Sequence, residues 1–468
     1  MAKKSGRTIA ARLATVAVGV GLWFIPPPEG LALQAWHLFA IFAAAILSVV
    51  VGAFPILTAS VFAVAAAVLT KTLKPEDAYS GFANPTILLI VVAFLVARAV
   101  VTSGLGERLG YRAVSLFGKS TLGLSYSIFL VDAVIAPAFP SNTARSGVLY
   151  PLAVSVAEAA GAKPGGSNPR LGRFLMFSGM ASLTLSSALW LTAMAGNPLG
   201  AEIARDSGVE IGFGNWLVAS SVPTLIGIAL LPFLLYKVIR PEVTATPKAP
   251  AEARRALKDL GPPTRDQKIV GVTFVGMVVL WGAAATLKLD STAIALLGLA
   301  VLLATQTLKD KDIAKEGETL ATFIWFAVLF ALSEQLDKLG FMSFLGERLA
   351  DAMSGMKPLV AGVTIVVAYV LLHYLFVSQT AHLLAVFGVF LGVGVKLGVS
   401  PAPLAFQLLF ATNYFSAITP QGSSANLLFA GSGYLSQGDL YKLGALTTLF
   451  GLLLYLVIGT PWLMLVAK

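Results

Sequence analysis

Apolar segments of about 17 to 25 residues recur along the 468-residue chain. Each is long enough to cross roughly 30 Å of hydrocarbon as an α-helix, whereas a membrane β-barrel would show short strands of alternating polarity. Because 57% of the residues are hydrophobic and only 12% are charged, a water-soluble fold would lack polar residues to cover its surface. The sequence therefore predicts an all-α polytopic membrane protein.

Glycine, proline and charged residues divide the apolar segments into eleven predicted transmembrane helices. Two further segments are too long for one crossing and are interrupted at their centres, so we predict two re-entrant hairpins, at 121–160 and 359–396. The basic start of the chain is typical of a signal peptide, but no convincing cleavage site follows, and we expect residues 7–24 to be retained. The helices are predicted at 8–25, 35–52, 54–70, 84–103, 171–205, 214–237, 267–286, 289–305, 319–337, 403–435 and 441–466.

Lysine and arginine residues are distributed unevenly between the connecting segments. If the N-terminus is cytoplasmic, cytoplasmic segments hold 22 and external segments hold 9 of the 33 basic residues, the other two being Arg98 and Arg145 inside apolar segments. Cytoplasmic loops of membrane proteins carry an excess of these residues. We therefore expect a cytoplasmic N-terminus and an external C-terminus. This distribution explains the net charge of +10 without a nucleic-acid partner.

Three short motifs occur twice, in the same order. "GLGERL" at 104–109 is followed by "FLGERL" at 344–349, "SNTAR" at 141–145 by "SQTAH" at 378–382, and "AMAGN" at 193–197 by "GSSAN" at 422–426. Five predicted crossings separate the starts of the two halves, and an odd number turns the second half upside down. We therefore predict an inverted repeat, although apolar helices can also resemble one another by chance.

The repeat gives a predicted domain organisation. An extra N-terminal helix occupies 1–34, and the first repeat, with hairpin 121–160, occupies 35–239. A polar cytoplasmic linker rich in proline and alanine occupies 240–266. The second repeat, with hairpin 359–396, occupies 267–468. Inverted repeats of this kind bring broken helices together near the bilayer midplane, where alternating access exposes a site to each side in turn.

Four predicted breaks interrupt the helices, at 137–143, 192–198, 378–380 and 418–426. Non-helical backbone inside a bilayer survives only where protein or a water-filled cavity supplies hydrogen-bond partners, so we expect the breaks to cluster. The N-terminal ends of the half-helices and their Ser, Thr and Asn side chains suit a carboxylate. Two such tips would hold both ends of a dicarboxylate, although Ser-Asn-Thr can also simply cap the following helix.

These paired motifs, the linker, the hairpins and the Asn-containing breaks resemble the divalent anion/sodium symporter family over about residues 36–461. "PSNTARSG" and "LTAMAGNPL" are most similar to the branch of 2-oxoglutarate/malate translocators and tartrate or citrate/succinate exchangers. The resemblance implies a homodimer, an elevator-like movement and substrate binding by the hairpin motifs. Gln379 departs from the family pattern, which often has Asn there. The expected substrate-binding residues are Ser141, Asn142, Thr143, Asn197, Ser378, Gln379, Thr380, Ser423 and Asn426.

Two cationic positions correspond under the repeat, because Arg145 follows Ser141 at the same spacing as His382 follows Ser378. Sodium-coupled members of the family are expected to hold a cation beside each tip, between side-chain oxygens and carbonyls of the facing break. Arg145 and His382 could stand in for those cations and balance a bound anion, which favours exchange over sodium-driven uptake. Arg145 could instead snorkel or pair with Asp132, and His382 could be an ordinary buried histidine.

The predicted function is sodium-independent exchange of dicarboxylates such as 2-oxoglutarate, malate or succinate across a bacterial inner membrane. The alternative of the same fold is a sodium-coupled di- or tricarboxylate symporter. A passive channel is a further alternative, and the location could be organellar. An enzyme is disfavoured because the chain has no cysteine, only three histidines and no H-E-x-x-H motif, and no metal or cofactor is predicted.

Overall fold

The computed structural model describes residues 2–467, with side chains from Thr8 onward. Within this range the chain is helical, and the only strand-like pairing is an isolated bridge between Ser120 and Ala245. The elements of the first half are α1 (Ala2–Phe24), α2 (Leu33–Val50), α3 (Ile56–Leu69), α4 (Pro75–Ala78), η1 (Ser80–Ala83), α5 (Pro85–Ser103), α6 (Leu105–Phe117), α7 (Thr121–Ile135), η2 (Ala136–Ala138), α8 (Asn142–Ala159), α9 (Pro169–Leu189), η3 (Leu191–Ala193), α10 (Gly196–Asp206) and α11 (Phe213–Ile239).

The second half repeats this order of elements after a helix in the linker. The elements are α12 (Ala249–Asp259), α13 (Arg265–Leu287), α14 (Ser291–Ala304), α15 (Asp310–Ile313), α16 (Gly317–Lys338), α17 (Phe341–Ala352), α18 (Pro358–Leu372), η4 (His373–Leu375), α19 (Gln379–Lys396), α20 (Pro401–Tyr414), η5 (Phe415–Ala417), α21 (Ser424–Ala430), α22 (Gln437–Leu454), η6 (Tyr455–Gly459) and α23 (Thr460–Val466). From α2 and α13 onward, both halves contain a long helix, a shorter apolar helix, a one-turn helix and another long helix. An amphipathic helix, a hairpin, a broken helix and a final long helix follow in each, and this order supports the predicted repeat.

Nine helices in the described part are long and apolar enough to cross a membrane. Six are predicted transmembrane helices, and three, at 121–138, 358–375 and 379–396, are arms of the predicted hairpins. Three further predicted spans are shorter apolar helices, at 8–24, 56–69 and 291–304. The remaining two, predicted at 171–205 and 403–435, are interrupted by η3 and η5. The chain is therefore a polytopic helical membrane protein.

Local sequence explains where several helices begin. Ser120 opens α7 by accepting a hydrogen bond from the Gly123 N–H, and Thr264 with Gln267 forms a capping box at the start of α13. Such caps satisfy the N–H groups that the first turn of a helix leaves unpaired. Two amphipathic helices, α6 and α17, were not predicted. Each directly follows a transmembrane helix and contains one copy of the repeated "LGERL" motif.

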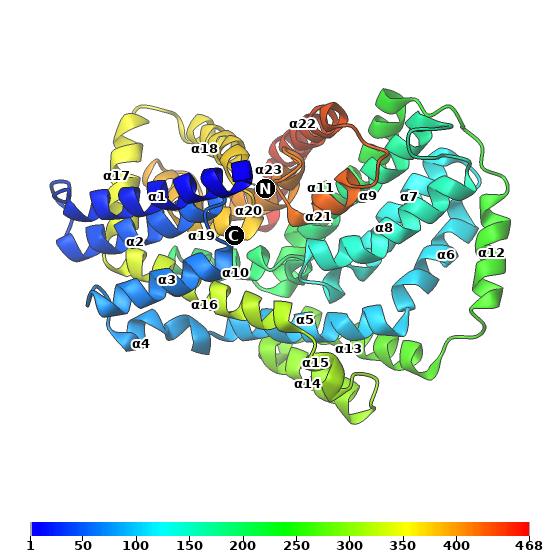
Figure 1. The fold of residues 1–468 in the computed structure, drawn as a ribbon, viewed down its shortest axis with the longest axis horizontal. Helices are drawn as coiled ribbons and strands as arrows, with labels where there is room; N and C mark the ends of the chain where they lie inside the picture. Colours follow the sequence, from blue (N-terminus) through cyan, green and yellow to red (C-terminus); the bar gives the residue numbers. More distant parts are fainter. Residues whose placement is uncertain (1, 468) are drawn as a thin grey trace. The chain divides into compact units, whose positions relative to one another are not determined.

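The chain divides into two compact units, and each takes segments from both halves of the sequence. Unit 1 consists of Met1–Val91, Leu199–Glu210 and Glu316–Ala405, and unit 2 consists of Val92–Pro198, Ile211–Lys315 and Phe406–Lys468. The boundaries of the predicted repeats thus differ from those of the units. In unit 1, α2 packs against both α1 and α3, and α16 packs against α2 and α3 (Figure 1).

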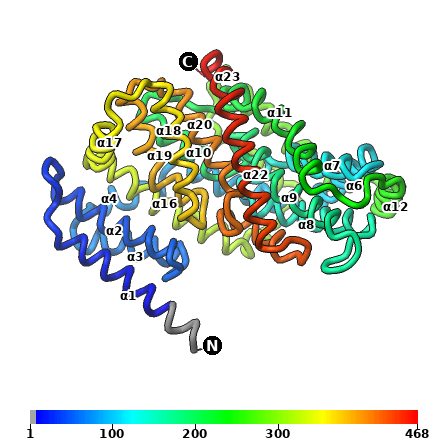
Figure 2. The backbone as a smooth tube through the Cα atoms, turned by 90° about the horizontal axis from the view of Figure 1, so that it is seen from above, coloured from blue at the N-terminus to red at the C-terminus, as the bar shows by residue number. Residues whose placement is uncertain are grey.

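Helix α9 is the centre of unit 2. It packs against α7, α8 and α11, and nearly every side chain from Leu171 to Leu189 is buried. The linker helix α12 runs beside α6 (Figure 1), and α22 continues through η6 into α23 next to α11 (Figure 2). The linker also bonds to the start of α7, where the Thr121 hydroxyl donates to the Val243 carbonyl at 2.6 Å. The predicted linker, residues 240–266, therefore packs against other helices of unit 2.

Candidate functional site

All four predicted breaks are present, and each begins and ends earlier in the chain than predicted. The hairpin interruptions end at Ser141 and Ser378, which are N-cap residues of α8 and α19, so the motif residues that follow are helical. The breaks after α9 and α20 end at Ala195 and Ser423, so Asn197 and Asn426 lie in the first turns of α10 and α21. The polar motifs therefore lie at helix N-termini, where Ser141 and Ser378 supply caps that apolar residues cannot.

The first hairpin tip is bonded to the break after α9, and both belong to unit 2. The Thr192 hydroxyl donates to the Pro137 carbonyl at 2.9 Å, and the Ala195 N–H donates to the Pro140 carbonyl at 2.9 Å. The indole of Trp190 donates to the Ala133 carbonyl at 2.9 Å. The non-helical backbone of one break thus receives hydrogen bonds from the other, as membrane depth requires.

Arg145 lies within this junction with its side chain fully buried. One terminal nitrogen donates to the Ala193 carbonyl at 2.6 Å, and the other donates to the Asn142 Oδ1 at 2.6 Å and the Ser187 hydroxyl at 2.5 Å. Its Nε lies 3.1 Å from a carboxylate oxygen of Asp132. A single guanidinium therefore contacts oxygen atoms of the first hairpin tip, of α7, of α9 and of the break after α9.

Asp132 is the buried counter-ion of Arg145, which was the alternative left open for this arginine. Its second oxygen accepts hydrogen bonds from the hydroxyls of Ser182 at 2.8 Å and Ser186 at 2.6 Å. Both charged side chains are fully buried. The positive charge of Arg145 is therefore already balanced inside the protein, so it is not left to balance a bound anion, as the sequence suggested that it could be.

Asn197 and Asn426 have equivalent roles in the two breaks. Asn197 donates to the carbonyls of Ser187 at 2.9 Å and Trp190 at 3.2 Å. Asn426 donates to the carbonyls of Ser416 at 2.8 Å and Thr419 at 3.2 Å. In each case the acceptors lie ten and seven residues earlier, so one amide bonds back to backbone carbonyls in or just before the first part of the break. Both side chains are buried.

The two breaks of unit 2 are joined to each other. The Asn413 amide donates to Asn197 Oδ1 at 2.9 Å, which links the end of α20 to the start of α10. The hydroxyls of Thr143 and Ser424 lie 2.6 Å apart and link the first turn of α8 to that of α21. Unit 2 thus brings together the first tip motif and both Asn-containing breaks, which are three of the four breaks that the sequence predicted to cluster.

Exposure separates these residues into two groups. Asn142, Arg145, Asn197, Ser423 and Asn426 are buried. Ser141 and Thr143 are half-buried and Ser424 is exposed, so their hydroxyls remain accessible at the same junction.

The second hairpin belongs to unit 1. Ser378 is half-buried and accepts a hydrogen bond from the Ala381 N–H at 3.3 Å, which matches Ser141 and the Ala144 N–H at 3.2 Å. Gln379, Thr380 and His382 are buried in the first turn of α19. The imidazole Nδ1 of His382 lies 3.3 Å from that of His373, so one of the pair donates to the other. The ring of Tyr369 packs edge-on against the His382 ring, and the ring of Phe376 packs against it at a tilt.

Sequence reasoning missed Ser182, Ser186, Ser187, Asn413 and Ser424. One signal was available in the sequence, since serines recur at 178, 182 and 186 within an apolar helix. Residues four apart share a helix face, so this spacing places a polar stripe on one side of α9. The stripe faces α7, where Ser178 bonds Ser125 at 2.7 Å and the other two bond Asp132.

Hairpins, broken helices and a buried polar junction within an otherwise apolar helical chain define a membrane transporter. The family model described as the sodium:sulfate symporter transmembrane region matches residues 7–468. The chain belongs to this family, that of the divalent anion/sodium symporters.

Relatives match over almost the whole chain. The putative malate transporter YflS of Bacillus subtilis is 40% identical, with 98% of this chain and 97% of the relative covered. The chloroplastic dicarboxylate transporter 1 of Spinacia oleracea is 36% identical, with 98% of this chain and 81% of the relative covered. The inner membrane protein YbhI of Escherichia coli is 32% identical, with 96% and 95% covered.

Two solved transporter structures share the fold. The YdaH transporter of Alcanivorax borkumensis gives a TM-score of 0.59 at 17% identity, covering 83% of this chain and 86% of its own. MtrF of Neisseria gonorrhoeae gives a TM-score of 0.62 at 13% identity, covering 97% of this chain and 98% of its own. At this identity the likeness concerns the fold alone.

Proposed function

We propose that the protein is a sodium-independent exchanger of small dicarboxylates such as 2-oxoglutarate, malate or succinate. Relatives named malate and dicarboxylate transporters match over nearly the full length of the chain, which supports this substrate class. No step of the proposal requires an enzyme activity. The observation that carries sodium independence is the environment of Arg145.

The guanidinium of Arg145 uses the oxygens that a cation would need beside the first tip. Its donors bond Asn142 Oδ1, the Ser187 hydroxyl and the Ala193 carbonyl, which are a tip side chain, a helix hydroxyl and a break carbonyl. This is the type of oxygen set that the family resemblance assigns to a sodium ion. A hard cation binds only where such oxygens are available to it. The fixed arginine therefore replaces the ion at this position.

Exchange follows from charge balance across the membrane. A dicarboxylate carries two negative charges at neutral pH, and moving two charges against 100 mV costs about 4.6 kcal/mol. Uptake of a dicarboxylate without a coupled cation would require this free energy in every transport cycle. Exchange of one dicarboxylate for another moves no net charge, so it requires neither sodium nor the membrane potential. The Arg145–Asp132 pair adds no net charge to either step.

The proposed carboxylate contacts in unit 2 are the accessible hydroxyls of Ser141, Thr143 and Ser424, at the N-terminal ends of α8 and α21. Helix N-termini and hydroxyl donors stabilise a carboxylate without a permanent charge. The buried Asn142, Asn197, Ser423 and Asn426 hold these helix ends in place. In unit 1, Ser378, Gln379 and Thr380 are proposed to contact substrate from the second tip, with His382 beside them.

We further propose an elevator-type movement within a homodimer in a bacterial inner membrane, with a cytoplasmic N-terminus. The repeated order of elements supports alternating access between two related conformations. The excess of basic residues in the predicted cytoplasmic segments supports this orientation.

Purified protein reconstituted into vesicles tests the proposal. Uptake of labelled dicarboxylate should require an unlabelled dicarboxylate inside and should be unaffected by replacing sodium with potassium. Net uptake into empty vesicles driven by a sodium gradient would instead establish the symporter alternative. Flux that neither saturates nor responds to internal substrate would indicate a channel.

Variants of Arg145 and Asp132 test whether this ion pair is needed for exchange. Arg145→Gln with Asp132→Asn removes both charges, leaves neutral side chains of similar size, and should abolish exchange. Thr102→Ala, on the exposed end of α5, is a control that should keep the wild-type rate. Unchanged exchange in the double variant would make the pair structural.

A further inference from the structure

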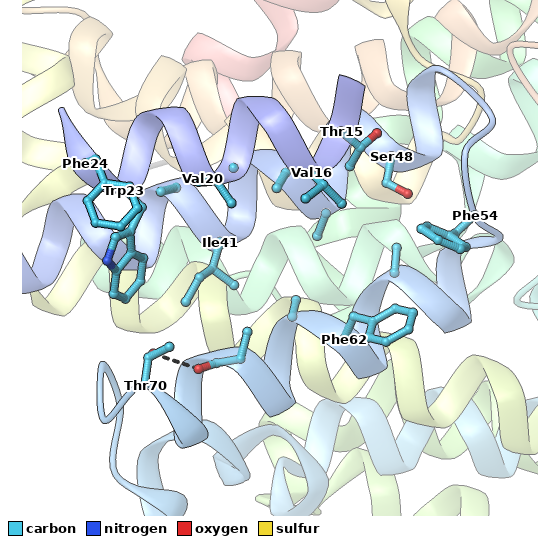
Figure 3. A pocket seen from close by; sticks show the side chains of 17 residues that line it. Thr15, Val16, Val20, Trp23, Phe24, Ile41, Ser48, Phe54, Phe62 and Thr70 are labelled. Atoms are coloured by element: carbon cyan, nitrogen blue, oxygen red, sulfur yellow. Dashed lines mark hydrogen bonds between the residues drawn. The ribbon is translucent and has the colours of Figure 1, made fainter. Parts of the chain in front are cut away.

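A hollow of about 470 Å³ lies on unit 1 between α1 and α3, which both pack against α2 (Figure 3). Its lining is almost entirely apolar, and Val20, Ile41 and Phe62 point into it from the three helices. Among the residues that the structure describes, its polar lining consists of Thr15, Ser48, Thr70 and the indole of Trp23, and no charged side chain lines it. An apolar hollow of this size has room for part of a ligand.

One end of the hollow is cationic. Arg12 is exposed and lies over the ring of Phe54, which lines the hollow, at 4.7 Å from the ring centre. Its Nε donates to the Ala53 carbonyl at 3.1 Å, in the loop between α2 and α3. Its two terminal nitrogens bond to no described residue, so they can still bind an anion.

The length of the hollow matches one leaflet of a bilayer. Its lining on α1 runs from Thr15 to Phe24, and nine residues of helix rise about 14 Å. Half of the hydrocarbon core is about 15 Å. An acyl chain lying along α1 would therefore fill the hollow while its headgroup reached Arg12.

We propose that this hollow binds an anionic phospholipid, with one acyl chain between α1 and α3 and its phosphate on Arg12. A second copy of the protein fits less well, because the face is apolar and basic without a carboxylate in its lining. In a two-fold dimer the same patch meets itself, so the basic end would meet a basic or apolar surface. Phospholipid supplies both the acyl chain and the negative charge.

Native mass spectrometry of protein extracted from vesicles of phosphatidylglycerol and phosphatidylcholine tests this site. Wild-type protein should retain phosphatidylglycerol in preference. Arg12→Gln should lower that preference about fivefold, the effect of one basic residue on an anionic lipid. Lys71→Gln, a loss of the same charge at the other end of α3, should leave it unchanged. Equal retention of the two lipids by wild-type protein would overturn the proposal.

A second pair of variants tests the acyl chain. Ala66→Phe fills the hollow from α3 and should reduce the number of retained lipids, whereas Ala65→Phe adds the same ring on the exposed face outside it. Both should keep dicarboxylate exchange, which shows that they fold. Equal lipid retention by the two variants would show that no acyl chain occupies the hollow. Loss of dimer in Ala66→Phe with lipid retention unchanged would assign the hollow to a second copy and overturn the lipid site.

Discussion

The carboxylate of Asp132 accepts from two serine hydroxyls and faces one guanidinium, all fully or almost fully buried. A buried carboxylate is stable only when its hydrogen bonds and its charge are both satisfied. At the scale of single residues, the site is therefore a set of mutually dependent groups. Removing one member leaves another without the partner that made its burial tolerable.

Asp132→Asn should destabilise the protein, because it leaves Arg145 buried without a counter-ion. Breaking a buried ion pair in this way costs about 3 to 5 kcal/mol. The melting temperature in detergent should fall, and it should partly recover in Asp132→Asn with Arg145→Gln. Ser182→Ala removes one hydroxyl donor from the same carboxylate and should cost about 1 kcal/mol. A wild-type melting temperature in Asp132→Asn would contradict this account of the pair.

Asn426→Ala should destabilise the break after α20, since the carbonyls of Ser416 and Thr419 would lose their shared donor. Each buried group left without a hydrogen bond costs about 1 to 3 kcal/mol. Thermal unfolding and vesicle exchange would both report the loss. Gln421→Ala removes an exposed amide from the same break and serves as the control, for which no change is expected. Equal stability of the two variants would show that the break does not depend on Asn426.

At the scale of elements, the breaks are held by the helices that cross them. Helix α22 passes the η5 break so closely that a Cβ at Gly444 would lie 2.0 Å from the Ala417 carbonyl oxygen. Only glycine allows this approach, because the contact is with backbone that is itself fixed by the break. Helix α22 thus helps to set the position of the break after α20.

Gly444→Ala should therefore displace η5 and reduce both stability and exchange. Gly438→Ala, on the same helix, meets no atom closer than 3.9 Å and provides the matched control. Because alanine favours a helix over glycine by about 1 kcal/mol, the control should be neutral or slightly stabilising. Melting temperature and exchange rate would be measured for both. Parallel behaviour of the two variants would show that the close approach has no consequence.

At the scale of the whole molecule, the linker joins the two halves of the sequence and contacts more than its neighbours in the chain. Glu242 accepts hydrogen bonds from the backbone N–H groups of Arg170 at 3.1 Å and Leu171 at 3.0 Å. These are the first free N–H groups of α9, since Pro169 has none, so the linker caps the central helix of unit 2. Partial burial would raise the pKa of Glu242, but the hydrogen bonds from its own backbone, Arg170 and Leu171 outweigh it and lower the pKa.

Glu242→Gln should lower the melting temperature at neutral pH, by the equivalent of about 1 kcal/mol for a lost cap. A lowered pKa means that the carboxylate stabilises the folded state above the ordinary glutamate pKa of about 4.3. The stabilisation is lost as the pH falls from there through the lowered pKa, so the difference between variant and wild type should shrink. Glu252→Gln, at an exposed glutamate of α12, is the control. A difference that does not change with pH would contradict the role of the charge.

Sequence alone determined the class of the protein and most of its helices, because length and apolarity are local properties that a bilayer requires of every span. It also identified the breaks, since Pro137, Pro140 and Pro420 with their polar neighbours cannot continue an apolar helix. Only the tertiary structure decided between the alternatives for Arg145, because Asp132, Ser187 and Ala193 come from separate elements whose meeting no local pattern encodes. The same reason hid Asn413 and Ser424, which become part of the site only through packing.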